Sequence, residues 1–322
     1  MMPIEEVIKN TKRISLKDYV CFTCTGCGEC CLQVKESVAL EPLDVFKITQ
    51  FLRTRDPSIR CIEDVLDRYT VPIFLTETGY MMFAMATEGE DHHCIFLRNS
   101  RCIIHEGKPR VCKLYPFVAG PADHGGLEYL LSTEKPFHFK GQLIRAKAWM
   151  KKYLTDEERE FIEADAASVV PIARLLQDIP QKEQTIALLH FIRFKYSDFD
   201  LDQPFVPQYK RNMAKLEAVL QQMITNGETH FAFASQRLTV CYGGAEYVLT
   251  GKEAKFWLDG RYGVANVPDN AAETMIGHLH RMGLVECEDE DNAVTKYRLP
   301  RRHHSGFLHH EMCFGSNAKD RI

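Results

Sequence analysis

Clustered cysteines are the residues of this sequence whose type and spacing can do chemistry. The chain has 322 residues and 12 cysteines, and five of these cysteines fall within residues 21–31. A small secreted protein would use such a cluster as a disulfide framework, but this chain is long and its first twenty residues lack the apolar run of a signal peptide. In a reducing compartment, clustered thiols are expected to bind zinc or iron.

The first cysteine group has a spacing that suits metal ligation. Cys24, Cys27 and Cys30 form a C-x2-C-x2-C run, and Cys31 follows directly. A C-x2-C step places two thiolates on one turn, and the glycines on either side of Cys27 allow the backbone angles of that turn. One ion cannot readily take four ligands from so tight a loop, so we expect more ligands from elsewhere.

A second group supplies them: Cys94, Cys102 and Cys112. Two tetrahedral zinc sites need eight ligands, which these seven cysteines and one of His92, His93 or His105 could provide. A [4Fe–4S] cluster needs four thiolates and leaves three over. The spacing leaves both metals open, and it equally allows zinc that only staples the domain together.

The remaining cysteines carry weaker signals. Cys21, with Cys24, Cys27 and Cys31, has the spacing of a bacterial ferredoxin, but Leu32 stands where proline would follow. Three others sit singly in apolar patterns and are expected to be inert core residues: Cys61, Cys241 and Cys287. The C-terminal tail, with paired histidines at 303–304 and 309–310 and with Cys313, is expected to be loosely ordered.

Composition limits the function further. Lys and Arg number 40 against 44 Asp and Glu, for a net charge of −4, which argues against a protein that coats nucleic acid or anionic lipid. We find no apolar run long enough for a membrane span. The expected location is therefore the cytoplasm.

The elements that must position these cysteines are predicted to form an α+β fold in three parts. Residues 1–140 form an irregular cysteine-cluster metal domain with helices over 42–52 and 62–69 and a hairpin centred on Thr78-Gly79. Residues 141–226 form a helical extension, with helices after a Thr155–Glu158 capping box, over 182–196 and over 212–223, and an ordered loop over 197–208.

Residues 227–322 are predicted to form a winged-helix-like domain with a flexible tail. Three β-like stretches (THFAFA, RLTVCYG, AEYVLT) precede helices near 252–258 and 270–282 and a hairpin of 284–288 with 294–299. The second of these helices carries little positive charge, so nucleic acid is not the expected partner.

Four runs carry a resemblance to a known family. They are F-x-C-x2-C-G-x-C-C from Phe22, C-I-F-L from Cys94, C-I-I-H-E from Cys102 and K-P-x2-C-x-L-Y-P-F from Lys108. They resemble the YkgJ-type cysteine-cluster family, a zinc- or iron-chelating domain with a CxxCxxCC pattern and three later cysteines. The resemblance covers residues 20–120 and implies metal binding by Cys24, Cys27, Cys30, Cys31, Cys94, Cys102 and Cys112.

The resemblance also implies functional alternatives. One branch of the family, the flagellin lysine N-methylases, combines this domain with an iron–sulfur cluster and S-adenosylmethionine, so a protein methylase or another peptide-modifying enzyme is one alternative. The run Phe256–Arg261, with His280 and Gly283, resembles PqqD-type domains that bind peptide substrates. Departures from the family pattern are Lys108 in place of arginine, His105 in place of an aromatic residue, and the extra Cys21. A zinc-stapled interaction module without catalysis is the other alternative.

Overall fold

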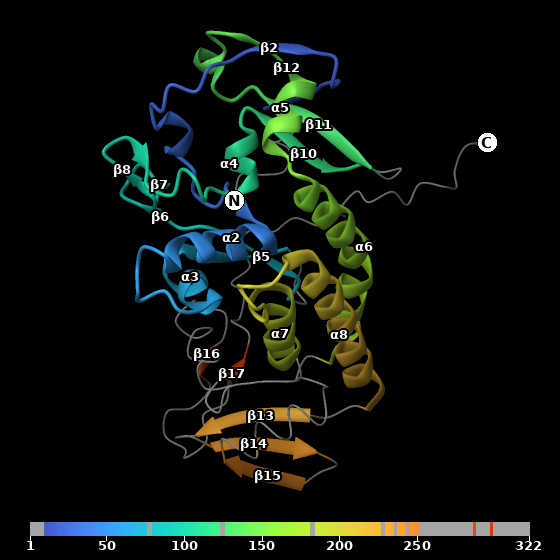
Figure 1. The fold of residues 1–322 in the computed structure, drawn as a ribbon. Helices are drawn as coiled ribbons and strands as arrows, with labels where there is room; N and C mark the ends of the chain where they lie inside the picture. The colour runs from blue at the N-terminus through green and yellow to red at the C-terminus, as the bar shows by residue number, and fades with distance from the viewer. Residues whose placement is uncertain are drawn as a thin grey trace, which may run out of the picture.

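The computed structural model describes the backbone of residues 10–75, 79–122, 126–180 and 184–226 and five later strands (Figure 1). The later strands are β13 (Thr229–Ala234), β14 (Arg237–Tyr242), β15 (Ala245–Thr250), β16 (Glu286–Cys287) and β17 (Tyr297–Arg298). Helices and strands are mixed throughout, as expected for an α+β protein.

The N-terminal half packs two helices against a small sheet. Helix α2 (Pro42–Arg53) and helix α3 (Ile62–Tyr69) are the two predicted helices. Strands β3 (Ala39–Leu40), β5 (Met81–Met85) and β4 (Thr70–Phe74) form an antiparallel sheet in that order. The predicted hairpin is thus confirmed in the pairing of Phe74 with Met81, while residues 76–78 of its turn lie outside the described residues.

Short strands and helices, several of which carry the cysteines, lie above this layer (Figure 1). Two of these sheets join distant parts of the chain: β1 (Thr11–Arg13) with β11 (Leu127–Ser132) and β10 (Phe117–Pro121), and β2 (Tyr19–Cys21) with β12 (Leu143–Arg145). Two hairpins are local: β6 (Thr87–Glu88) with β7 (His93–Cys94), and β8 (Leu97–Arg98) with β9 (Arg101–Cys102). The short helices are η1 (Glu29–Cys31), α4 (Arg110–Leu114) and η2 (Pro136–His138).

The helices predicted within residues 141–226 are present, with one difference. Helices α5 (Ala146–Tyr153), α6 (Asp156–Asp178) and α7 (Gln184–Ile192) are followed by a π-helical turn, η4 (Arg193–Ser197), and by α8 (Phe205–Asn226). Thr155 and Glu158 form the predicted capping box of α6. Helix α8 begins seven residues earlier than predicted. Phe205, which the sequence pattern assigned to a loop, is fully buried, and this packing outweighs the local polar composition.

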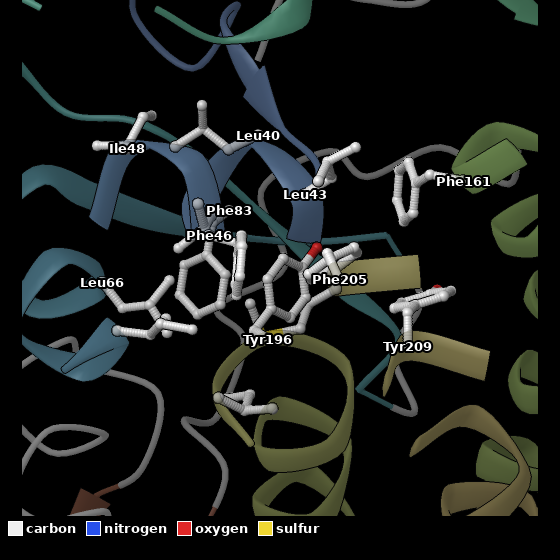
Figure 2. Close-up of a cluster of buried hydrophobic side chains, with 14 of the residues drawn as sticks. Leu40, Leu43, Phe46, Ile48, Leu66, Phe83, Phe161, Tyr196, Phe205 and Tyr209 are labelled. Atoms are coloured by element: carbon white, nitrogen blue, oxygen red, sulfur yellow. The ribbon is translucent and has the colours of Figure 1, made fainter. Parts of the chain in front are cut away.

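One hydrophobic core joins α2 to the helical extension (Figure 2). The ring of Phe46 lies 5.0 Å from that of Phe205, and the ring of Phe161 lies 5.1 Å from that of Tyr209. A buried ion pair lies beside these rings, because the ammonium of Lys195 is 2.5 Å from the carboxylate of Asp165. This hydrophobic core therefore stabilises the part of the fold that carries the proposed metal ligands.

The C-terminal strands agree with the β-like stretches of the sequence. Strands β13, β14 and β15 form an antiparallel sheet in sequence order, and β16 pairs with β17 within the predicted hairpin. The two helices predicted over 252–258 and 270–282, and the tail with its histidines and Cys313, lie outside the described residues. In the part of the chain that the structure describes, every helix is too short or too polar to cross a bilayer.

The buried imidazole of His190 in α7 predicts a pH-dependent stability. Burial, with the charge of Arg193, lowers the pKa of His190 to about 3 from 6.5. As the pH falls, His190 of the unfolded chain is protonated before His190 of the folded chain. The free energy of unfolding therefore keeps its full value above about pH 6.5 and decreases as the pH drops toward 3, by at most about 1.4 kcal/mol per pH unit. His190→Gln removes this contribution to the pH dependence of stability. Between pH 7 and 5 wild type is expected to lose about 2 kcal/mol more than the variant in urea unfolding.

The control for this prediction is His92→Gln, a change at an exposed histidine. It should keep the wild-type pH dependence. Identical pH dependence in wild type and His190→Gln would show that the buried ring does not resist protonation.

Candidate metal centre

The first cysteine group lies on a turn that only glycine adopts easily. Gly26 and Gly28 both have positive φ angles, in the left-handed region. The N–H of Cys31 then donates to the carbonyl oxygen of Gly28 at 2.8 Å, which closes η1. Beside this turn, Cys27 lines a pocket, and Cys31 packs against the hydrophobic core.

The second group is carried by three separate short elements. Cys94 ends β7, Cys102 ends β9 and Cys112 lies in the middle of α4. The hairpin of β8 and β9 lies against the first group at Gly28, where an added Cβ would come within 2.9 Å of the carbonyl oxygen of Ser100. The hairpin that carries Cys102 therefore lies against the turn that carries the first group.

This contact gives a prediction with a matched control. Gly28→Ala forces a left-handed φ on alanine and also pushes against the backbone of Ser100, so we expect losses of both stability and metal affinity. Gly26→Ala carries the same φ penalty, but nothing lies within 4 Å of its Cβ. Thermal unfolding and metal titration of both variants should show the larger loss for Gly28→Ala. Equal losses would mean that the turn does not depend on the hairpin.

Six of the seven proposed ligands line one cavity of about 330 Å³. They are Cys24, Cys30, Cys31, Cys94, Cys102 and Cys112. The seventh, Cys27, lines an adjacent pocket of about 450 Å³, to which Cys24 and Cys30 also contribute. Among the described residues, no three Cys, His, Asp or Glu side chains converge closely enough to hold an ion as they stand. The thiols surround a space and do not meet at a point.

The chemistry of these thiols fits a cation. Burial raises the pKa of Cys94 to about 11 and also raises the pKa of Cys102 and of Cys112. Cys30 and Cys31 have sulfur atoms 3.9 Å apart, and their hydrogen bond lowers the pKa of Cys30 to about 6 while it raises that of Cys31. Thiolates become stable here when positive charge enters the cavity, and zinc or iron would supply that charge.

Helix α4, which carries Cys112, is held by two carboxylates near the start of α2. Asp44 accepts a hydrogen bond from the backbone N–H of Arg110 at 2.6 Å and another from the N–H of Glu41 at 3.1 Å. The guanidinium of Arg110 pairs with the carboxylate of Glu41 and donates to the carbonyl oxygen of Ala119. Because Arg110 is the first residue of α4, these contacts fix the position of Cys112.

The three histidines that the sequence indicated as a possible eighth ligand have different surroundings in the structure. His105 lines the 330 Å³ cavity together with Lys108 and Lys135. His93 instead pairs with Asp91 at 2.7 Å, and His92 is exposed.

A different histidine, His138, lies next to a proposed ligand: its Nε2 is 3.6 Å from the sulfur of Cys27. Sequence reasoning missed it because it lies 26 residues beyond the last cysteine of the cluster. The preceding Lys-Pro-Phe was its only local signal, and that run is not typical of a ligand.

Two further cysteines, Cys21 and Cys61, line neither cavity. Cys21 is exposed on β2. Cys61 stands at the N-cap of α3, where its thiol donates to Asp64 and burial raises its pKa to about 12. Cys241 and Cys287 lie in β14 and β16.

Comparison with known proteins agrees with this geometry. Residues 23–142 match the model of the CxxCxxCC family, described as "Putative zinc- or iron-chelating domain". No curated protein and no solved structure matches the chain. The matched segment contains all seven cysteines around the two cavities, as well as His138. Residues 23–142 of this chain thus resemble the domain that the CxxCxxCC family model describes.

Proposed function

We propose that residues 23–142 bind a thiolate-ligated metal centre in the 330 Å³ cavity. The observation that carries this proposal is the meeting of cysteines from the turn at Gly28, from β7 and β9, and from α4 on the wall of one cavity. The ligands of this metal centre are drawn from Cys30, Cys31, Cys94, Cys102 and Cys112. A centre that needs reduced thiols also supports a reducing compartment, the cytoplasm, as its location.

We favour a [4Fe–4S] cluster over a single zinc ion in this cavity. The cavity encloses far more space than one ion fills, whereas a structural zinc site closes around its ion. An iron–sulfur cluster takes four thiolates, and the wall of the cavity offers more than four. Zinc is the competing assignment, because the 3.9 Å between the sulfurs of Cys30 and Cys31 also suits two thiolates that share one tetrahedral ion.

Metal analysis tests this proposal. The full chain, purified without oxygen, should contain about four irons and four sulfides and show a broad absorption near 400 nm that bleaches on reduction. Cys102→Ser should reduce iron and sulfide together, and Cys21→Ser, outside the cavity, should not. Zinc with no sulfide in a colourless sample would assign the cavity to zinc, and absence of any metal would overturn the proposal.

A cluster-dependent enzyme that modifies a peptide is the second candidate. The observation that favours it is a pair of ammonium groups, Lys108 and Lys135, on the wall of the same cavity. They can bind the carboxylate of a cofactor such as S-adenosylmethionine next to a cluster. The substrate peptide would bind to the proposed winged-helix-like region, residues 227–322.

Calorimetric titration of S-adenosylmethionine into the metal-loaded chain tests this candidate. Binding that Lys108→Ala weakens would support it. No heat of binding in a chain with its full metal content would leave the cysteines as a structural or storage centre.

A further inference from the structure

The imidazole of His138 has the arrangement of a metal ligand. Its Nδ1 lies 2.7 Å from the hydroxyl of Tyr115, and its Nε2 lies 3.6 Å from the sulfur of Cys27. Histidines that bind metals almost always use the second ring nitrogen in such a hydrogen bond, which fixes the orientation of the ring. The ring is thus oriented with Nε2 toward a thiol.

The distance between these two atoms matches a shared ion. Zinc binds sulfur at about 2.3 Å and imidazole nitrogen at about 2.0–2.1 Å, so a sulfur and a nitrogen at one tetrahedral ion lie about 3.6 Å apart. That is the separation of Cys27 and His138. Cys24 and Cys30 line the same pocket of about 450 Å³.

The loop that carries His138 is fastened to the loop that carries Cys24. Strand β12 pairs with β2, and the N–H of Phe22 donates to the carbonyl oxygen of Gln142 at 2.9 Å. In the other direction, the N–H of Gln142 donates to the hydroxyl of Thr23 at 3.0 Å. Gly141 lies so close to Thr23 that a Cβ would come within 2.8 Å of the Cβ of Thr23. The histidine therefore faces the first cysteine group through contacts that do not depend on a metal.

We propose that Cys24, Cys27 and His138 form a second site, which binds one zinc ion or a chemically similar divalent ion. The inference rests on the proposed function, since it assumes that the first cysteine group binds metal. Two of the ligands already stand at ligand spacing, and Cys24, which lines the same pocket, is proposed as the third. Three protein ligands leave the fourth position for water or for Cys30, which lines both cavities. The cysteines of this domain are then divided between two centres.

Cadmium-113 NMR of the full chain, with zinc analysis alongside, tests the second site. Wild type should show a cadmium resonance in the range of mixed sulfur and nitrogen ligands. His138→Ala should lose that resonance and about one zinc per chain, and His138→Cys should restore the bound ion with a shift toward all-sulfur ligation. Tyr115→Phe, which keeps the ring and removes the hydroxyl, should weaken this site by about 10–100-fold. His93→Ala is the control, because His93 pairs with Asp91 in the β6–β7 hairpin.

The outcomes separate the two proposals. A chain that binds metal but keeps every resonance and its full zinc content in His138→Ala would overturn the second site and leave the first centre standing. A wild-type chain without bound metal would overturn both. Loss of the mixed-ligand resonance in His138→Ala, with iron and sulfide unchanged, would establish the second site.

Discussion

Arg110→Ala is expected to lower the free energy of unfolding by about 3–5 kcal/mol. The substitution leaves the carboxylates of Glu41 and Asp44 beside each other without their cation, and Asp44 is only 4% exposed. Burial already raises the pKa of Glu41 to about 7 even with Arg110 in place, which shows how poorly solvated this position is. Urea unfolding at pH 8 measures the loss.

The control is Lys210→Ala, which breaks the exposed pair with Glu160. In that pair the ammonium and the carboxylate are 2.7 Å apart. Because both groups are exposed to solvent, the pair should contribute less than about 1 kcal/mol to the free energy of unfolding. We also expect Arg110→Ala to weaken metal binding, because α4 loses the guanidinium contacts to Glu41 and Ala119 at the residue two positions before Cys112. A loss no larger than that of Lys210→Ala would show that α4 is not held by these carboxylates.

Cys112→Ser is expected to have the second large effect, on metal affinity. The side chain faces the 330 Å³ cavity, and its thiol is the only candidate ligand that α4 contributes. Loss of a direct ligand should exceed the roughly 10–100-fold cost of losing a group that only orients one. Because metal binding to such a domain adds to its folding free energy, the thermal unfolding temperature of the loaded chain should fall as well.

Cys61→Ser is the matched control for this change. Serine is a good N-cap residue, so the N-terminus of α3 should keep its stability, and the metal content should not change. If Cys112→Ser and Cys61→Ser retain the same metal affinity, Cys112 does not belong to the ligand set.

Local patterns in the sequence predicted much of the support for the site. Pro42 marked the start of α2, and the Thr155–Glu158 capping box marked the start of α6. The β-like stretches after residue 228 correspond to β13, β14 and β15. These features depend on residues close together in the chain, where capping, helical period and β-propensity act.

The features that the sequence did not predict depend on contacts between distant residues. Asp44 and Arg110 are 66 residues apart, and Cys27 and His138 are 111 apart. Nothing in the periodicity around residue 138 indicates that the pairing of β2 with β12 brings this histidine back to the cysteine turn. The early start of α8 has a similar cause, since Phe205 becomes helical by packing on Phe46.

The cysteine spacing likewise indicated metal ligands, but it did not indicate which cysteines line which cavity. Cys27 and Cys30 are three residues apart and the left-handed Gly28 lies between them, yet Cys27 lines only the pocket of about 450 Å³, whereas Cys30 lines both cavities. A pattern of C-x2-C steps cannot distinguish these positions, because the spacing does not reveal the left-handed φ angle of the intervening Gly28.

X-ray absorption at the iron and zinc edges of the anaerobically purified chain tests the central claim most directly. We expect a first shell dominated by sulfur, at about 2.3 Å from zinc, and at iron a second shell of neighbouring iron atoms. We also expect Cys94→Ser and Cys112→Ser to lower the number of sulfur neighbours or to remove the metal. A first shell of only oxygen and nitrogen, or a chain without bound iron or zinc, would contradict the central claim.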